Sequence, residues 1–594
     1  MSENQSSRDP GMQKYFFRAS AENFKKIPGQ LIGYWATEEI LFAFESAPKL
    51  GEKVIFRKGM VTADNALFIR NWQEVSLMEI GLNFPDRNSA KLSERRWFPY
   101  TKGGEFRKWY GNNNFVVNWE NDGSILQTKR HHTDDRVAAT NFNLDFIFRE
   151  GATYSSISSS SFSIRYTPIG FLYDQKGAPV FSGTKDNLSY AVSLLNSRTS
   201  KKILDILCPT MDFNSGSLAE LPSLAQSELQ KKIDATFQCL IDASRIDWNS
   251  SEMSWDFSCL PLLHPVHRQP TLKASYQKLR THWREMTLGM QRQEEENNRI
   301  FIDAYGLQDE LTPEVPLNEI TLTCNPHYRY GGDKSEEELE TLLLADTMRE
   351  LVSYAVGCML GRYSLDKPGL ILANQGETLA DYVAQVPQPS FPADDDNVIP
   401  VLDDDWFADD ITLRFRQFLR VAFAEAHYED NLAFIEQALN VKGKRNYSLR
   451  DYFLSEFYAD HVKRYKKRPI YWLFSSPKGS FNALIYMHRY RPDTVSVLLK
   501  YLRDYREKLV TEKERQASAS INPATSQGDK TRALKEVDRL AKVLAELEEY
   551  ERNVLYPLAT EQIAIDLDDG VKVNYLKFGA ALKKITGLDA KEED

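Results

Sequence analysis

The chain of 594 residues lacks several features that would place it in a common class. It has no apolar run of about 18 residues, so we expect no transmembrane helix. Met1 to Pro10 are polar, and we expect no secretory signal there. The five cysteines are scattered and form no CxxC pair. This usage favours a reduced, cytoplasmic protein without a structural zinc site.

Sequence motifs of common enzymes are also absent. A Rossmann or methyltransferase cofactor loop needs closely spaced glycines, because its backbone must approach the ligand. No two glycines here have a single residue between them, and neither a Walker loop nor a Gly-x-Ser-x-Gly elbow occurs. His264 and His267 are close in sequence, but no Cys/His/Asp cluster accompanies them, so turn histidines are favoured over a metal site. We therefore expect no catalytic residue and no bound metal.

One tetrapeptide, Asn325-Pro326-His327-Tyr328, comes close to a catalytic motif. Adenine methyltransferases use Asn/Asp-Pro-Pro-Tyr/Phe to hold a flipped base. Here histidine replaces the second proline, and no cofactor loop precedes the motif. The favoured interpretation is a turn before a helix that begins near Lys334. A complete methyltransferase with a divergent site at 325–328 stays as an alternative, which binding of S-adenosylmethionine would reveal.

The charge of the chain is unevenly distributed. Its net charge of −10 argues against nucleic acid at first sight. Residues 1–222, however, hold 27 Lys and Arg against 24 Asp and Glu, so the excess of acid lies in residues 223–594. DNA binding depends on a local basic surface rather than on the total charge. The overall acidity is therefore compatible with a DNA-binding region.

Hydrophobic patterning predicts an α+β domain followed by a mainly α-helical C-terminal region. Alternation in Ser161–Tyr166 is typical of a strand, and Phe115–Trp119 and Phe171–Tyr173 are further strand candidates. After Pro222 the period becomes helical. Near the end, Leu498, Leu502, Tyr505 and Leu509 predict one helical stripe, and Leu534, Val537, Ala541 and Leu544 predict a second, as in a helix hairpin. The expected domains are a connector at 1–30, an α+β domain at 31–222, a helical spacer at 223–390 and a helical domain at 391–594 with a flexible segment at 516–529.

Basic residues interleaved with aromatic and amide side chains mark the candidate binding segments. Residues 102–114 combine glycines for close backbone approach, cations for phosphates and asparagines that can pair with adenine. Lys129-Arg130-His131-His132 offers further cationic and hydrogen-bonding groups, although a solvated loop is an equal alternative. Residues 442–468 hold nine Lys and Arg against three acids. That segment is compatible with a phosphate contact or with a solvated helix face.

Several segments resemble the C-terminal half of the PglX family, the adenine-specific DNA methyltransferases of the BREX phage-defence system. The stretch at 194–222 also looks like the end of target-recognition domains in type I specificity subunits. The resemblance covers the chain from about residue 14 onward. The segments that carry it are 26–40, 56–72, 100–123, 153–174, 194–222, 361–383, 396–410 and 466–490.

This resemblance implies a target-recognition domain at 31–222, whose loops enter the major groove of double-stranded DNA. In the family an adenine is flipped into the methyltransferase lobe and methylated at N6. The chain would be the non-catalytic half: the S-adenosylmethionine loop and the Asn-Pro-Pro-Tyr motif would lie in a missing methyltransferase lobe, and this chain would hold no cofactor. The partners implied are DNA, that lobe and other BREX proteins, with no membrane.

The residues expected to contact DNA follow from residue type and loop context. Lys and Arg would hold phosphates, whereas Asn and Arg at base edges would set specificity. An alternative is an interaction scaffold, in which the acidic helical half docks other BREX proteins and DNA contact is weak. The predicted DNA-contacting residues are Arg57, Lys58, Lys102, Arg107, Lys108, Asn112, Asn113, Lys129, Arg130 and His131.

Overall fold

The computed structural model describes residues 19–131, 135–157, 161–210, 212–224 and 227–589. The chain forms two compact units that interleave along the sequence. Unit 1 comprises Met1–Ala63, Gly81–Trp248 and Arg284–Arg329, and unit 2 comprises Asp64–Ile80, Asn249–Trp283 and Tyr330–Asp594. Each unit therefore gathers segments that are distant in sequence, and each is described by itself.

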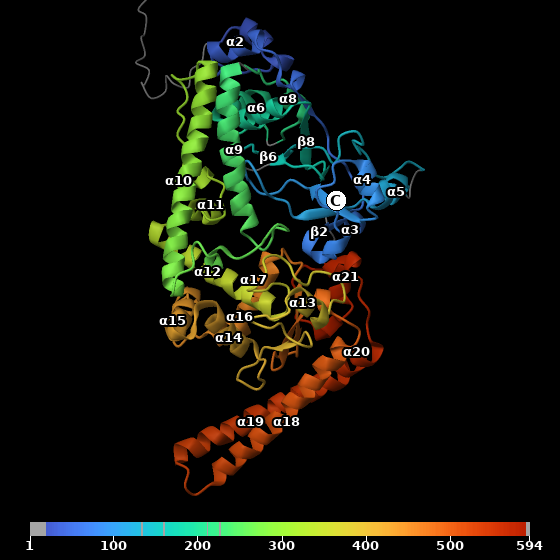
Figure 1. The fold of residues 1–594 in the computed structure, drawn as a ribbon, viewed down its shortest axis with the longest axis vertical. Coiled ribbons are helices and arrows are strands. Elements are labelled where there is room, and N and C mark those ends of the chain that lie inside the picture. The colour runs from blue at the N-terminus through green and yellow to red at the C-terminus, as the bar shows by residue number, and fades with distance from the viewer. Residues whose placement is uncertain (1–18, 132–134, 158–160, 211, 225–226, 590–594) are drawn as a thin grey trace, which may run out of the picture. The chain divides into compact units, whose positions relative to one another are not determined.

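Unit 1 contains two small sheets (Figure 1). The first is antiparallel in the order β1-β8-β5-β6, with β1 at Val54–Phe56, β5 at Gly151–Ser155, β6 at Ile164–Thr167 and β8 at Gly177–Ser182. In the second, β3 (Trp97–Thr101) pairs antiparallel with β4 (Phe115–Asn118) and parallel with β7 (Leu172–Tyr173). All five residues of β3 and of β5 are buried, so these strands are covered on both faces. The predicted strands at 115–119, 161–166 and 171–173 are thus confirmed, with ends shifted by a few residues.

Helices complete unit 1. Two consecutive helices are α6 (Lys185–Leu195) and α7 (Arg198–Leu207). The chain turns at Asn196, whose side chain bonds the backbone of Ile164 at 3.0 and 2.9 Å. The other helices in or entering this unit are α1 (Ala21–Lys26), α2 (Glu38–Ser46), α4 (Arg87–Leu92), α5 (Glu120–Thr128), α8 (Ser215–Ala219), α9 (Ser227–Asn249), α10 (Leu272–Tyr305) and α11 (Pro326–Tyr330).

Unit 2 is mainly helical, with a small antiparallel sheet in the order β10-β11-β9. The helix that was expected to begin near Lys334 is α12, which begins after the capping residue Ser335. The strands are β2 (Ile69–Asn71), β9 (Ile399–Pro400), β10 (Tyr471–Ser475) and β11 (Asn482–Tyr486). The helices are α3 (Asn65–Phe68), α12 (Glu336–Met359), α13 (Leu379–Gln385), α14 (Ile411–Phe423), α15 (Tyr428–Leu439), α16 (Leu449–Ser455), α17 (Phe457–Arg464), α18 (Thr494–Ile521), α19 (Gln527–Tyr550), α20 (Tyr556–Glu561) and α21 (Gly570–Leu576).

The predicted helix hairpin is confirmed by α18 and α19, which run side by side in Figure 1. The first predicted stripe is buried throughout. The second is wrong in part, because Leu534 is 55% exposed and Ala541 is exposed. The buried residues of α19 instead include Ala533, Leu540 and Leu547. Residues seven positions apart lie on the same face of a helix, so Ala533, Leu540 and Leu547 form the buried face of α19. Leu534 lies one position away from this face and is exposed despite its larger side chain.

The structure confirms a mixture of helices and small sheets with much helix. Within the residues described, no helix is long and apolar enough to cross a membrane. The same residues contain no group of three or more His, Cys, Asp or Glu side chains that could hold a metal ion.

Candidate nucleic-acid interface

The loop at 102–114 joins β3 to β4 in unit 1 and contains five of the ten predicted DNA-contacting residues. Its path needs backbone conformations that favour glycine: φ is +125° at Gly104 and +120° at Gly111. A Cβ at Gly111 would lie 2.7 Å from Cδ of Arg107 and 2.8 Å from the Trp248 ring. The glycines noted in the sequence thus allow the loop to fold back on its own side chains.

Arg107 lies in the base of this loop rather than on the surface. The residue is 8% exposed. The guanidinium donates to the Thr321 carbonyl at 3.3 Å and to Oγ1 of Thr323 at 3.1 Å, and lies 3.5 Å from the Asp247 carboxylate. It also faces the Trp248 ring at 5.1 Å. These contacts use the planar, multiply donating character of arginine to hold the loop in place.

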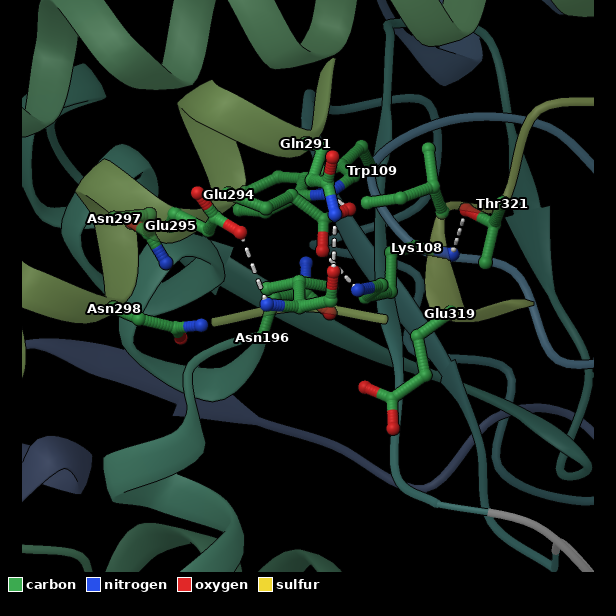
Figure 2. A network of polar contacts seen from close by, with 12 residues as sticks. Lys108, Trp109, Asn196, Gln291, Glu294, Glu295, Asn297, Asn298, Glu319 and Thr321 are labelled. Carbon is green, nitrogen blue, oxygen red and sulfur yellow. Dashed lines mark hydrogen bonds and ion pairs between the residues drawn. The ribbon is translucent and has the colours of Figure 1, made fainter. Parts of the chain in front are cut away.

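Lys108 is likewise buried, at 5% exposure, and forms an ion pair with Glu294 of α10. The same carboxylate accepts a hydrogen bond from Nε1 of Trp109 at 2.9 Å, and the backbone N–H of Lys108 donates to Oγ1 of Thr321 at 3.1 Å. Figure 2 shows these side chains converging from the loop, from α10 and from the segment around Thr321. Burial raises the pKa of Glu294, while Lys108 and Trp109 oppose that shift by stabilising its anion.

The two predicted asparagines of the loop differ in exposure. Asn112 is half-buried with φ +63°, and its Nδ2 donates to the Glu105 carbonyl at 2.9 Å, which closes the outer turn of the loop. Asn113 is buried at 7% exposure. Around Asn112 the exposed part of the loop is formed by Gly104 and Glu105.

Three segments of unit 1 meet at the end of β7 and bring cations together. Met60 donates its N–H to the Tyr173 carbonyl at 2.6 Å, and Asp174 donates its N–H to the Thr101 carbonyl at 2.9 Å. Segments 57–60 and 101–103 therefore flank the turn at 173–177. That turn is fixed by Asp174, whose Oδ1 accepts from the N–H of Lys176 at 2.7 Å. We call the cations that these segments carry the cationic rim: Arg57, Lys58, Lys102 and Lys176.

Most side chains of the cationic rim are accessible. Arg57, Lys58 and Lys176 are exposed, and Lys102 is half-buried with its ammonium 5.9 Å from the Phe115 ring. Beneath them Asp174 is 6% exposed, and burial raises its pKa. Of the rim, Lys102 and Lys176 act on this buried carboxyl group, and the four cations carry an excess of positive charge that favours binding of an anion.

An arginine pair extends this surface. The guanidinium of Arg57 lies 4.8 Å from the Phe146 ring, and that of Arg149 lies 5.6 Å from the same ring. Nδ2 of Asn143 donates to the Lys58 carbonyl at 2.6 Å, so the segment that carries Phe146 is tied to the rim. Stacking on an aromatic ring restricts an arginine side chain and lowers the entropy it would lose on binding.

The predicted residues Lys129, Arg130 and His131 lie on a separate loop. Arg130 and His131 are exposed, whereas Lys129 is half-buried; His132 lies outside the described residues. The N–H of His131 donates to the Arg136 carbonyl at 3.0 Å, and the chain returns to the rim at Thr140, which pairs with Val61. The structure thus connects this loop to segment 57–61 through backbone pairing.

The tetrapeptide at 325–328 begins the short helix α11, and the side chain of Asn325 is fully buried. Its Nδ2 donates to the carbonyls of Leu317 at 2.7 Å and Ile320 at 2.8 Å, and its Oδ1 accepts from the N–H of His327. Tyr328 donates its hydroxyl to the Phe106 carbonyl at 2.5 Å. The amide that would hold a base in the related motif therefore bonds local backbone instead.

Sequence reasoning missed Lys176 and Arg149 as members of this surface. Each stands apart in the sequence from the clusters of basic residues that marked the other candidates. The signal available for Lys176 was the segment Asp174-Gln175-Lys176-Gly177, whose composition is typical of a tight turn at a strand end.

No family model matches the chain. The chain is, however, similar to adenine-specific methyltransferases. One is the adenine-specific methyltransferase BrxX of Escherichia coli O9:H4 (strain HS), 37% identical over 593 residues, which cover 96% of this chain and 46% of the relative. Another is the adenine-specific methyltransferase PglX of Lacticaseibacillus casei (strain Zhang), 37% identical over 588 residues, or 97% of this chain and 46% of the relative. The chain is a homologue of these methyltransferases and spans about half their length.

This finding corrects one expectation from the sequence. The chain was expected to be specifically the C-terminal half of a PglX methyltransferase, and that identification is wrong. The matches run through 96% and 97% of the chain, so the likeness to the methyltransferase family belongs to the chain as a whole.

Proposed function

We propose that this chain binds double-stranded DNA through unit 1 and reads its sequence for N6-adenine methylation in BREX phage defence. The cationic rim is the observation that carries the proposal. Three separate segments bring Arg57, Lys58, Lys102 and Lys176 to one end of β7, where phosphates of a duplex would neutralise them. The relatedness to adenine-specific methyltransferases supports DNA as the polyanion.

The predicted residues divide into two roles. Exposed cations of the rim, with Arg130 and His131, would contact phosphates or base edges. Arg107 and Lys108 would act from below, because their buried contacts fix the loop that presents Lys102 and Asn112. Sequence specificity would come from the outer turn of the loop, where the half-buried Asn112 has a side chain able to reach adenine after exchange of its bond to Glu105.

The methyl donor of this reaction class is S-adenosylmethionine. We propose that its site lies outside this chain, on a methyltransferase lobe that works with it. The lack of a Gly-x-Gly pair and the full engagement of the Asn325 amide support this proposal. Calorimetric titration of the chain with S-adenosylmethionine tests it directly. Detectable binding would overturn it in favour of a divergent site at 325–328.

Fluorescence anisotropy with a pool of random duplexes at low salt tests DNA binding. The rim variant changes Arg57, Lys58, Lys102 and Lys176 to Gln. Its control changes four exposed lysines of the same unit, Lys185, Lys201, Lys231 and Lys232, to Gln. Both variants remove four positive charges, so only the position differs. We expect binding to weaken at least tenfold more in the rim variant than in the control, and equal weakening would refute the assignment.

The alternative function, a scaffold for other BREX proteins, would use the acidic surface of unit 2. Part of that acidity is engaged within the unit: the guanidinium of Arg450 contacts Asp405 and lies 3.1 Å from Asp410. Absence of DNA binding by the intact chain at low salt would favour the scaffold. Co-purification with BREX proteins that is abolished by charge reversal of the exposed Asp404 would then support it.

A further inference from the structure

A cavity of about 940 Å³ lies within unit 2, and its lining includes Lys463, Lys466 and Lys467 of the basic segment at 442–468. Its walls come from α16, α17, β10, α19 and the segment at 583–586. The inner surface is largely apolar, with Phe453, Tyr458, Val462, Leu473 and Val543 among the lining residues. A cavity of this size is typical of sites for small organic ligands, which commonly occupy about 300–1,000 Å³.

Lysines surround this apolar interior. The lining includes six lysines and one arginine but a single carboxylate, Asp403, which lies 3.3 Å from Arg539. The lysines of the cavity are Lys463, Lys466, Lys467, Lys478, Lys583 and Lys584. All six residues are exposed, so a solute that enters the cavity meets them. The excess of positive charge selects an anionic ligand.

Two of these lysines sit on strained backbone directly after α17. φ is +50° at Lys466 and +63° at Lys467, in the left-handed region that β-carbon-bearing residues rarely adopt. The turn is held by the N–H of Lys467, which donates to the Val462 carbonyl at 2.8 Å. Strain of this kind costs on the order of 1–3 kcal/mol per residue and tends to occur at functional sites. Here its effect is to direct consecutive lysines to one cavity.

Lys478 is held in place from below by a buried glutamate. Glu546 of α19 is 8% exposed and accepts three hydrogen bonds, from the N–H of Lys478 at 2.7 Å and from the hydroxyls of Ser476 at 2.7 Å and Ser480 at 2.5 Å. These bonds fix the β10–β11 turn that carries Lys478. The carboxylate is thereby engaged with the turn, and Lys478 is left at the cavity.

We propose that this cavity binds a nucleotide-class ligand, with its phosphates at the cavity lysines and its base against the apolar wall. Lysine is suited to phosphate as a point charge, and an apolar wall with Tyr458 and Phe453 suits a planar base. A DNA duplex fits less well, because its backbone would contact the lysines and leave the apolar interior unused. The proposal is independent of the DNA-binding function of unit 1.

Calorimetry on the full chain with three probes tests whether the cavity lysines bind the phosphates and the apolar wall binds the base. ATP carries both parts of the ligand, adenosine carries only the base and sugar, and inorganic tripolyphosphate carries only the anion. We expect ATP to bind at least tenfold more tightly than either of the others. No heat of binding with millimolar ATP would overturn the proposal, and equal affinities for ATP and tripolyphosphate would overturn the assignment of the apolar wall.

Variants locate the site. Changing Lys463, Lys467 and Lys478 to Gln should weaken ATP binding at least tenfold, whereas the matched change of Lys273, Lys442 and Lys500, exposed lysines of the same unit that do not line the cavity, should leave it within twofold. Ala459→Trp keeps every charge and fills the cavity, so it should weaken ATP and spare tripolyphosphate. Equal effects of the two lysine variants would overturn the site. If random duplex displaces ATP, and the same lysine variant abolishes that displacement, the cavity lysines bind DNA. This result would also overturn the proposal of a nucleotide site.

Discussion

Two Arg-Lys dipeptides in unit 1 have the same composition and opposite environments. Arg57-Lys58 is exposed beside β1, whereas Arg107-Lys108 is buried at the base of the 102–114 loop. The first has its positive charge directed to solvent. The second contacts Asp247 and Glu294, both of which are themselves buried. A basic dipeptide near aromatic residues can therefore be a candidate phosphate contact or part of buried ion pairs that stabilise a loop.

The difference decides which substitutions are informative about DNA. Removing Arg107 or Lys108 leaves a buried carboxylate without its cation, and breaking a buried pair in this way costs about 3–5 kcal/mol. Weaker DNA binding in such a variant would therefore report an unfolded loop. Substitutions at Arg57 and Lys58 change the surface charge and, at Arg57, the contact with the Phe146 ring, but they leave no buried carboxylate unpaired.

The largest expected effect is at Lys108. Lys108→Ala should lower the free energy of unfolding by about 3–5 kcal/mol, because Glu294 would stay buried without a counter-charge. Urea denaturation measures this. Lys108→Met combined with Glu294→Gln should recover more than half of that free energy. A cost below about 1 kcal/mol for Lys108→Ala would show that the pair is solvated and the contrast with Lys58 is false.

The next effect is expected at Gly111, which lets the loop close over Arg107. Gly111→Ala puts a Cβ at φ +120° and within 2.8 Å of two side chains, so we expect a cost of about 1–3 kcal/mol. Gly183→Ala is the matched control, because nothing lies within 4 Å of its added Cβ. Thermal unfolding compares the two. Equal melting temperatures would mean that the loop does not depend on this close approach.

Asp394 in unit 2 is a buried carboxyl group whose negative charge is poorly compensated by nearby cations, unlike those of Asp247 and Glu294. Burial, with Asp396 and Asp409 nearby, raises the pKa of Asp394 to about 7, although Arg489 and Arg414 oppose the shift. The pKa of this carboxyl group in the unfolded chain is near 3.8. The stability that the protonated group contributes is therefore fully present below about pH 4 and is lost as the pH rises to 7. Asp394→Asn should therefore stabilise the protein at pH 8 by at least about 1 kcal/mol, the equivalent of one pKa unit, and have little effect at pH 4. A melting-temperature gain that does not grow with pH would contradict this.

The smallest effect on stability is expected at the exposed dipeptide. Arg57→Gln with Lys58→Gln should change the free energy of unfolding by less than about 1 kcal/mol, since neither side chain is buried. The same double variant should weaken duplex binding several-fold. A large decrease in stability, measured by urea denaturation beside the Lys108 variants, would abolish the distinction between the two dipeptides.

The sequence alone predicts local structure well where one segment decides it. Strands at 115–119 and 171–173 and the α18–α19 hairpin follow from local periodicity, and all are present. The burial of Lys108 could not be predicted, because it depends on Glu294, 186 residues away. Lys176 was missed for the same reason: only the pairing of Met60 and Thr101 with the end of β7 brings it near Lys58 and Lys102. Which DNA contacts are correct stays a prediction.

The salt dependence of duplex binding tests the central claim most directly. Each phosphate that the protein neutralises adds about 0.9 to the magnitude of the slope of log binding constant against log salt concentration. Changing Arg57, Lys58, Lys102 and Lys176 to Gln should reduce that magnitude by about 3, since four phosphates at about 0.9 each set the upper limit. The control at Lys185, Lys201, Lys231 and Lys232 should leave it within about 0.5 of the unmodified chain, which is less than the effect of one phosphate. Equal slopes in all three proteins would contradict the assignment of this surface to DNA.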